Sequence, residues 1–513
     1  MLSEFLLTDM ARRRSASTFI DAKAMPLHRQ LYEAVRRAIL DGHLAPGERL
    51  PSTRDLALDL DISRNTVIAA LGQLTVEGYV TSHVGSGTYV SSNLQGKLEP
   101  RFHAPGQSGN PGSAKVQPLQ ARRPHLSQRG AALLGRYTAA ELEVQPFTNS
   151  SLDFSPFPMA LWQRLQNKHW RCSYPEMLDY SDAGGHAALR RAVADYLRVF
   201  RSMQLGADQV VITSGTQQSI GLCAQLLANS GDTVWMEDPA YWGAVKALTA
   251  SGLLIHPVPV DSEGIAPGLK DEAVPPRLIY ATPSHQYPTG AVMSLARRQQ
   301  LLATARQHNA WILEDDYDSE FRFSGPPVSS LEGLDRDDRV VYMGTFSKVL
   351  YPGLKIGYLV VPKILVEPFR TAHYDLNRPG QLHLQAALAE FIDMGYFAAA
   401  LRKARISYAQ RRLCLLEGLA PCLALNSAGR SATVTGAEQG LHLCIRLPVD
   451  LDDQALARHI AQRGLLVRPL SRYCLQRSDM RGLLVGYGYA PLEAVRQAAP
   501  VLGQLILKAL ESK

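Results

Sequence analysis

Lys348 is the residue of this sequence best suited to covalent chemistry. It follows the apolar segment Val340–Met343 in a loop of small residues, and a Pro-Gly turn, a second cation at Lys355 and another apolar segment come after it. Burial and nearby cations lower the pKa of a lysine, and the neutral amine can then attack a carbonyl group. An isolated loop lysine is usually solvated, so the expectation of Schiff-base chemistry depends on further motifs.

A phosphate-binding turn is predicted near residue 215. The apolar strand Val210–Thr213 runs into SGTQQ (214–218), which opens a helix. Small residues at such a turn expose backbone N–H groups at the positive end of the helix dipole, where anions bind. Many turns of this kind are only tight helix starts, so the motif is weak by itself.

Three other motifs carry polar and aromatic groups at the ends of expected strands. They are WILEDDYDSEF (311–321), TPSHQYPTG (282–290) and EDPAYWG (237–243). Acids at the carboxyl end of a buried strand face the ligand crevice of an open α/β sheet. A carboxylate there can keep a pyridine nitrogen protonated, and the aromatic rings of the third motif could stack on such a ring. A lone acidic pair is more often a solvated loop.

The elements that must position these groups divide the chain into regions. From about residue 139 to 513, strand-like runs alternate with helical segments, which predicts an α/β fold with a mostly parallel sheet covered on both faces. Residues 93–138 are rich in Gly, Pro, Ser, Gln and Arg and are expected to form a basic flexible linker. Glu99 is the only acid between residues 95 and 135, which indicates a polyanionic partner.

Residues 26–92, which follow an N-terminal tail of residues 1–25, show the pattern of a helix-turn-helix. A helix with an apolar stripe is expected over 26–41, Ser52 is expected to cap a second helix, and Ser63 a third. A small hairpin around SHVGSG would form a wing. The alternative is a three-helix bundle that mediates only protein contacts.

This region closely resembles the GntR-type winged helix over nearly all of residues 26–92. The resemblance is carried by the glycine-containing wing and by the segment LAPGERLPSTRDLALDLDISRNTVIAALGQLTVEGYV. The resemblance implies binding to a double-stranded DNA operator. Arginine suits phosphate or guanine contacts, and Asn65 can bond bidentately to adenine. The residues that the resemblance places against DNA are Arg54, Ser63, Arg64, Asn65, Thr66 and Gly85.

From about Phe154 to the C-terminus, the chain resembles the aminotransferase-like half of the MocR group of GntR regulators. The resemblance is carried by five motifs in their order along the chain, SGTQQ, EDPAYWG, TPSHQYPTG, EDDYDSEF and GTFSK. The resemblance implies a fold-type I aminotransferase domain with a small C-terminal α+β subdomain and pyridoxal 5'-phosphate as cofactor. Lys348 would be the Schiff-base lysine, and the residues expected around the cofactor are Gly215, Thr216, Tyr241, Asp315, Tyr317, Thr345 and Lys355.

Within this group, the resemblance gives Asp315 to the pyridine nitrogen, Tyr317 to the ring phenolate oxygen and Tyr241 to stacking. Gly215, Thr216 and Thr345 would hold the phosphate. Tyr180 matches a tyrosine that reaches the phosphate of the partner subunit, so a two-fold homodimer is implied, and a head-to-tail, domain-swapped form is expected. Arg481 matches the arginine that binds a substrate α-carboxylate, and Arg468 is the second candidate.

Two departures from the family pattern affect these expectations. Lys355 stands where the family usually has arginine, and it supplies only a point charge to the phosphate. Trp242-Gly243 follows the stacking tyrosine, so no arginine is present there to bind a distal carboxylate. This argues mildly against an effector that is a dicarboxylate or a γ-amino acid.

Composition limits the remaining classes. An apolar content of 46% with 20% charged residues is that of a globular protein without a membrane-spanning segment. The six cysteines form no CxxC pair, and no histidine cluster has metal-ligand spacing, so reduced thiols and no metal are expected. We expect a cytoplasmic protein, associated with the bacterial nucleoid when it is bound to DNA.

These observations predict a transcription regulator that senses a small amino compound or the cofactor itself. An effector amine would displace Lys348 and change the affinity for DNA, because a ligand that binds one arrangement more tightly shifts the population toward it. The alternative is a working aminotransferase with an accessory DNA-binding domain.

Overall fold

The computed structural model describes residues 5–8, 25–83, 86–92, 126–133, 145–149, 152–171, 175–180, 183–325, 328–425 and 429–512. It divides into two compact units, residues 1–120 and 121–513. Gly85 and most of the expected linker lie outside the described residues. The linker range does include one unpredicted helix, α5 (Gln128–Leu133), which belongs to the second unit.

The first unit is a three-helix module with a hairpin. Its elements are α2 (Leu27–Leu40), α3 (Thr53–Asp59), α4 (Arg64–Val76), β1 (Val80–His83) and β2 (Gly87–Val90). The two strands pair antiparallel. Leu31 and Val35 of α2 pack with Val67 and Leu74 of α4 in one buried cluster. Apolar residues recur at helical spacing on both helices, so both bury one stripe.

An eight-stranded sheet forms the centre of the second unit, in the order β3-β10-β9-β8-β7-β4-β5-β6. The strands are β3 (Val210–Thr213), β4 (Thr233–Asp238), β5 (Leu254–Asp261), β6 (Gly264–Ile265), β7 (Leu278–Ala281), β8 (Trp311–Asp316), β9 (Val340–Thr345) and β10 (Gly357–Val360). Strands β5, β4, β7, β8 and β9 pair in parallel, whereas β10 is antiparallel to both β3 and β9. The sheet is therefore mostly parallel, as predicted.

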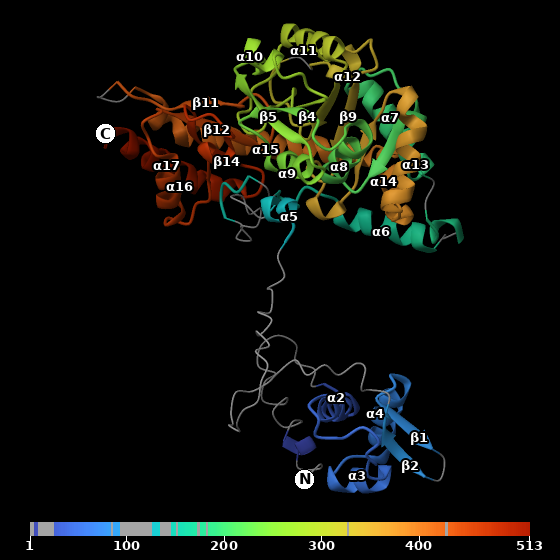
Figure 1. The fold of residues 1–513 in the computed structure, drawn as a ribbon. Helices are drawn as coiled ribbons and strands as arrows, with labels where there is room; N and C mark the ends of the chain where they lie inside the picture. The colour runs from blue at the N-terminus through green and yellow to red at the C-terminus, as the bar shows by residue number, and fades with distance from the viewer. Residues whose placement is uncertain are drawn as a thin grey trace, which may run out of the picture. The chain divides into compact units, whose positions relative to one another are not determined.

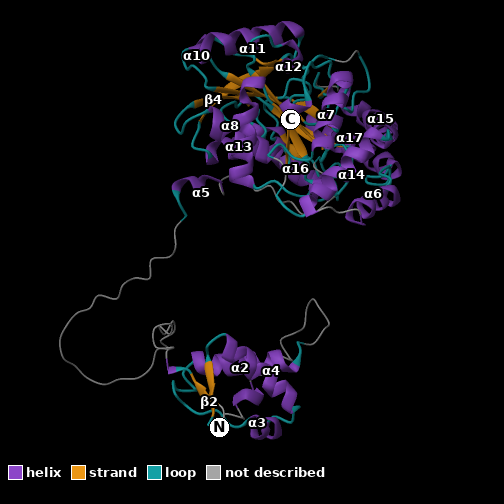
Figure 2. Ribbon diagram, turned by 90° about the vertical axis from the view of Figure 1, so that its right-hand side faces the viewer, coloured by secondary structure: helices purple, strands orange, loops and turns teal. Residues whose placement is uncertain are grey.

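Helices cover both faces of this sheet, and Figure 2 shows the strands lying between them. Val211 and Leu359 pack in one cluster with α8 (Thr216–Leu227), α9 (Trp242–Ala250) and α13 (Val366–Asn377). Ile212 and Tyr358 face the other way, toward α7 (Ala187–Phe200) and α14 (Leu382–Asp393). Successive strand residues point to opposite faces, so nearly continuous apolar strands fit a sheet buried on both sides.

The C-terminal part forms a smaller α+β subdomain, coloured from orange to red in Figure 1. Its antiparallel sheet has the order β11-β12-β14-β13. The elements are α15 (Tyr396–Leu423), β11 (Thr433–Thr435), β12 (His442–Leu447), α16 (Asp453–Ala461), β13 (Arg468–Pro469), β14 (Arg481–Gly486) and α17 (Leu492–Glu511).

Shorter elements complete the second unit. They are α6 (Met159–Arg171), α10 (Leu269–Glu272), α11 (Leu295–His308), α12 (Leu331–Leu334) and short 3-10 turns at Pro175–Met177, Ala207–Gln209, Pro352–Leu354, Lys363–Leu365 and Leu470–Tyr473. Helices α10, α11 and α12 lie together at the top of Figure 1. In the described part of the chain, no single helix is long and apolar enough to cross a membrane. Among the helices that the structure describes, the pair α14 and α15, bent by 75° between them, would pass by length and composition.

Candidate functional site

A cavity of about 650 Å³ lies where β8 and β9 end and where the turn after β3 enters α8. It brings together residues from motifs that are far apart in the sequence. Eight of the expected cofactor residues line it, namely Gly215, Thr216, Tyr241, Asp315, Tyr317, Thr345, Lys348 and Lys355. The carboxyl ends of parallel strands meet at one edge of a sheet, which explains why these motifs converge.

Lys348 is half-buried in the loop after β9 and lines the cavity. Burial is the largest effect on its amine and lowers the pKa. The negative charges of Asp318 and Asp315 raise this pKa, and the positive charge of Arg468 lowers it further. A lowered pKa increases the neutral fraction of the amine, which is the form that reacts with a carbonyl group. The environment that the sequence predicted for Lys348 is therefore present.

Asp315 is one of two buried carboxylates that line the cavity, with 3% of its surface exposed. Its Oδ2 accepts a hydrogen bond from the hydroxyl of Tyr280 at 2.5 Å, and no partner among the described residues reaches Oδ1. Burial raises the pKa of Asp315 to about 7, although the Tyr280 hydrogen bond acts in the opposite direction. A buried acceptor without a donor is costly, so this oxygen fits the N–H of a protonated pyridine.

The turn between β3 and α8 is the one for which phosphate binding is predicted. Gly215 has φ of 115° at the N-cap of α8, a conformation that L side chains rarely adopt, and a Cβ there would meet nothing within 4 Å. Thr345 is buried beside it at the end of β9, and its hydroxyl accepts a hydrogen bond from the Ser347 N–H at 3.2 Å. Lys355 is exposed with φ of 52° and adds a positive charge.

Aromatic rings form another part of the cavity. Tyr241 packs edge-on against Tyr287 with ring centres 5.6 Å apart, and its hydroxyl accepts a hydrogen bond from Gln217 Nε2 at 3.2 Å. The Tyr317 hydroxyl donates to the carbonyl oxygen of His285 at 2.9 Å and lies 3.0 Å from Nδ1 of the same residue. Both expected ring contacts therefore face the cavity from fixed positions.

Sequence reasoning did not identify a buried cluster of His285, Asp318 and His442 behind Tyr317. His285 Nδ1 lies 3.1 Å from both carboxylate oxygens of Asp318, and the ligand-type atoms of all three residues lie within 4.8 Å of one another. Burial lowers the pKa of His442 to about 3, with a further contribution from His285. The three residues come from separate motifs, so no local spacing could have indicated the cluster.

The structure places the two candidates for the carboxylate-binding arginine differently. Arg481 does not line the cavity, because its guanidinium turns back to donate hydrogen bonds at 3.0 Å to the carbonyl oxygens of Ser478 and Met480. Arg468, the second candidate, does line it, from β13 next to Leu484 on β14. The sequence placed both arginines near the small sheet but could not show which side chain points inward.

Tyr180 also lies outside the cavity of its own chain, with 59% of its surface exposed. Its ring packs near Tyr374 and under the guanidinium of Arg378. Several lining residues were not among the predictions, including Asn149, Ser214, Gln217, Asp318, Ser347, His442, Arg472 and Tyr473. Ser214, Gln217, Ser347 and Asp318 stand next to predicted residues, so the motif signal extended to them.

The first unit exposes the side chains expected to contact DNA. Arg54, Arg64 and Asn65 are exposed at the starts of α3 and α4. Ser63 caps α4, since its Oγ accepts the Thr66 N–H at 3.1 Å and lies 2.8 Å from the Thr66 hydroxyl. Arg64 Nε also donates to Thr53 Oγ1 at 3.4 Å. The first turn of the recognition helix therefore presents two long polar side chains to solvent.

Comparison with known proteins identifies the families of both units. Residues 27–90 match the model of the gntR family of bacterial regulatory proteins, and residues 160–482 match aminotransferase class I and II. The chain is 38% identical, over 95% of both chains, to the probable rhizopine catabolism regulatory protein MocR of Rhizobium meliloti. It is 28% identical to the pyridoxine biosynthesis regulator PdxR of Corynebacterium glutamicum, over 90% of this chain and 91% of PdxR.

Solved structures show the fold of the second unit. The kynurenine aminotransferase of Pyrococcus horikoshii is 23% identical, with a TM-score of 0.65 over 74% of this chain and 93% of that enzyme. The multiple substrate aminotransferase of Thermococcus profundus is 23% identical, with a TM-score of 0.67 over 76% and 98%. The chain thus belongs to the MocR-type branch of the GntR family, as a DNA-binding transcription regulator with a pyridoxal phosphate-binding domain of the aminotransferase class I and II type.

Proposed function

We propose that this regulator changes its affinity for an operator when an amino compound, or pyridoxal phosphate itself, enters the cavity around Lys348. The observation that carries the proposal is the joint presence, in one cavity, of Lys348, the buried Asp315 and the turn at Gly215. A helix-turn-helix in the same chain gives this chemistry a regulatory use. We place the protein in the cytoplasm.

Each residue of the cavity has a defined task in this proposal. Pyridoxal phosphate supplies an aldehyde that condenses reversibly with amines. Lys348 would hold it through its Nζ, Asp315 would accept a hydrogen bond from the N–H of the protonated pyridine, and Tyr317 would bind the ring oxygen. Gly215 and Thr216 hold the phosphate through the N-terminus of α8. Arg468 is the residue proposed to bind the carboxylate of an effector, because it faces the cavity.

At the DNA, we propose that Arg54, Arg64 and Asn65 make the contacts to phosphates and base edges. All three side chains are exposed, whereas the hydroxyls of Ser63 and Thr66 bond to each other. Their part is then to fix the start of α4 against the backbone. Gly85 stays a proposed contact in the wing and lies outside the described residues.

The proposed active form is a homodimer with the two chains head to tail. The exposure of Tyr180 supports this, because a phosphate ligand that points away from its own cavity is available to a second chain. Most soluble oligomers with such shared sites are two-fold symmetric.

Two variants separate the DNA-binding surface from the cavity. The operator is first obtained by sequencing DNA fragments that the purified protein retains. Arg64→Ala should weaken binding to this operator by about 1–3 kcal/mol, measured by fluorescence anisotropy at two salt concentrations, and leave the cofactor absorbance unchanged. Lys348→Ala should retain binding in the absence of amines and lose the response to a panel of amino acids.

Each half of the proposal can fail separately. Normal operator binding by Arg64→Ala would contradict the role of α4. A full response of Lys348→Ala to amines would show that the lysine is not part of the sensing step. Independently of that response, we expect this variant to lose the visible absorbance of the cofactor near ~420 nm.

The second candidate function is that of an aminotransferase. The complete set of Lys348, Asp315 and Tyr317 in one cavity favours it, since these groups suffice to bind and polarise the cofactor. Steady-state transfer of an amino group to 2-oxoglutarate at about 1–10³ per second would support this function. Rates far below that range, together with an amine effect on operator binding, would support the regulator.

A further inference from the structure

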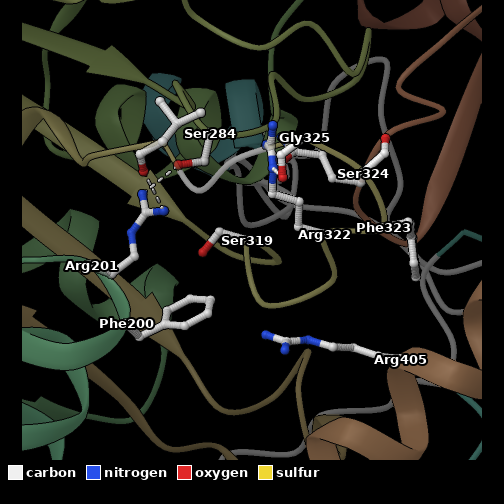
Figure 3. Close-up of a pocket in the computed structure, with 11 residues that line it drawn as sticks. Phe200, Arg201, Ser284, Ser319, Arg322, Phe323, Ser324, Gly325 and Arg405 are labelled. Atoms are coloured by element: carbon white, nitrogen blue, oxygen red, sulfur yellow. Dashed lines mark hydrogen bonds between the residues drawn. The ribbon is translucent and has the colours of Figure 1, made fainter.

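A second cavity, of about 390 Å³, lies in the same unit as the cofactor cavity. Figure 3 shows the side chains of Arg201, Arg322 and Arg405 entering it from three sides, with Ser319 and Phe200 between them. The residues come from the end of α7, the loop after β8 and helix α15. Ligand pockets commonly have volumes from about 300 Å³ upward, so a small metabolite would fit.

The charges around this second cavity do not balance. Arg201 is paired with Asp316, with Nε 3.1 Å from Oδ2. No ion pair with a described acid is formed by Arg322 or Arg405; Arg405 Nε donates to the Glu320 carbonyl oxygen at 2.5 Å, and Arg322 donates to Gln439. Burial raises the pKa of the nearby Glu320, which favours the neutral form of its side chain. Two guanidinium charges are therefore left without a counter-charge.

Uncharged donors of the same cavity add a second, independent sign of a ligand. Gln439 is 2% exposed, its Oε1 accepts from Arg322 Nη1 at 2.7 Å, and its Nε2 has no partner in the described part of the chain. A buried amide N–H₂ without an acceptor is costly unless something supplies one. Ser284 and Ser324 also line the cavity. The lining residues therefore offer several donors, and none of them is a carboxylate.

We propose that this cavity binds a small dianion, such as a dicarboxylate or a phosphate ester. Guanidinium groups form paired hydrogen bonds with carboxylate and phosphate oxygens, and two of them match two negative charges. The Gln439 amide and the serine hydroxyls would donate to the remaining oxygens. The ring of Phe200, 5.7 Å from the Arg405 guanidinium carbon, can cover the carbon part of the ligand.

The position of the site gives it a regulatory meaning, which rests on the proposed function. Three chain segments line both cavities with near-neighbouring residues. Ser284, Ser319 and Gln439 face the dianion site. Neighbouring residues of the same three segments line the cofactor cavity, namely Thr282, Tyr287, Asp318, Leu441 and His442. Binding on one side should therefore change the surroundings of the cofactor on the other, through the buried cluster of His285, Asp318 and His442.

Calorimetric titration of the cofactor-saturated full-length protein tests the site directly. Saturation keeps the phosphate-binding turn at Gly215 occupied, so a probe cannot bind there. Succinate and inorganic phosphate are the two probes, and the one that binds more tightly shows whether the site prefers carboxylates or phosphates. We expect saturable binding of at least one of them, with one site per chain and a small shift of the visible absorbance of the cofactor.

Variants then locate the site. Arg322→Gln and Arg405→Gln should each weaken binding at least fivefold, whereas Arg336→Gln, at an exposed arginine of the same unit, should leave it unchanged. Arg405→Lys retains the charge and should weaken binding less than Arg405→Gln does. Absence of binding by the parent protein, or equal affinity in all variants, would overturn the proposal. Neither result would affect the Lys348 and Arg64 tests of the proposed function.

Discussion

Asp315 illustrates how a residue can be costly for stability and useful for binding. Burial raises the pKa of its carboxyl to about 7, from a value near 3.8 in an unfolded chain. Between these two pH values the folded state holds the extra proton, so its stability decreases as the pH rises through this window. Asp315→Asn should therefore stabilise the cofactor-free protein at pH 8.

The same substitution should weaken cofactor binding. An amide cannot carry the negative charge that pairs with a protonated pyridine nitrogen, and loss of a charge-assisted hydrogen bond costs about 1.5–3 kcal/mol, roughly a tenfold to hundredfold loss of affinity. Absorbance titration of cofactor into the stripped protein measures this, with Asp337→Asn, an exposed residue, as the control. Unchanged affinity would contradict the assignment of Asp315 to the ring nitrogen.

His442 predicts an acid sensitivity of the second unit. Its pKa is lowered to about 3 by burial, against about 6.5 in an unfolded chain. Between pH 6.5 and 3 the unfolded state binds the extra proton, so stability falls as the pH falls, by up to about 1.4 kcal/mol per pH unit for this residue. His442→Gln should lose stability less steeply below pH 6.5 than the parent does.

Tryptophan fluorescence in denaturant titrations at pH 7, 6 and 5 measures this difference. All five tryptophans lie between residues 162 and 311, so the signal reports on the second unit alone. His459→Gln, at an exposed position, is the matched control. Equal slopes for the parent and His442→Gln would show that this histidine does not dominate the acid response.

At the residue scale, the sequence predicted which residues meet in one cavity where those residues belong to local motifs. Lys348, Asp315 and Gly215 each follow a buried strand, and strand ends in a parallel sheet converge. It could not decide between Arg481 and Arg468, because the direction of a side chain on a short strand depends on register. Arg481 opens β14 opposite Leu447, whereas Arg468 lies opposite Leu484, and this pairing has no local signature.

At the scale of elements, the apolar strands and the capped helices were predictable, and the antiparallel insertion of β10 was not. Caps at Ser52 and Ser63 have a local chemical signature, and both hydroxyls accept the expected N–H. The place of β10 between β3 and β9 depends on contacts between distant segments. Its consequence is a close approach of backbone segments beside the phosphate turn.

Gly357 allows this approach. It opens β10, and a Cβ there would lie 2.8 Å from the Gly215 Cα and 3.0 Å from the Gly344 carbonyl oxygen. Both contacts are with backbone, which cannot move aside as a flexible side chain could. Gly357→Ala should displace the turn at Gly215 and weaken cofactor binding by roughly tenfold or more, as expected for a misplaced binding group.

Gly221→Ala is the control for this prediction, because a Cβ at that helical position would meet nothing within 4 Å. It should retain cofactor affinity and stabilise α8 by up to about 1 kcal/mol. Absorbance titration and thermal unfolding of both variants distinguish a displaced turn from a general loss of stability. Parent-like affinity in Gly357→Ala would show that the turn tolerates the shift.

At the scale of the whole molecule, the two units separate two kinds of chemistry. The first exposes the arginines and Asn65 of a DNA-binding helix pair, and the second encloses Lys348 in a sheet-edge cavity. Communication between them requires a change that one unit can transmit to the other. In the proposed dimer, each cavity is completed by the partner subunit, so occupancy of the cavity and the arrangement of the two chains become linked.

Hybrid dimers test this sharing directly. A Tyr180→Ala chain is co-expressed with a differently tagged Lys348→Ala chain, and the hybrid is isolated by both tags.

If Tyr180 acts across the interface, the chain that retains Lys348 receives an intact tyrosine from its partner, and one of the two cavities is complete. At a cofactor concentration that fills the parent sites but not the weaker Tyr180→Ala sites, the hybrid should then show about half of the parent absorbance per dimer, with parent-like affinity at that site. The Lys348→Ala homodimer should show no lysine-linked absorbance, and the Tyr180→Ala homodimer should bind the cofactor more weakly at both sites. If Tyr180 acts within its own chain, the hybrid has no complete cavity and its remaining site keeps the weak affinity of the Tyr180→Ala protein.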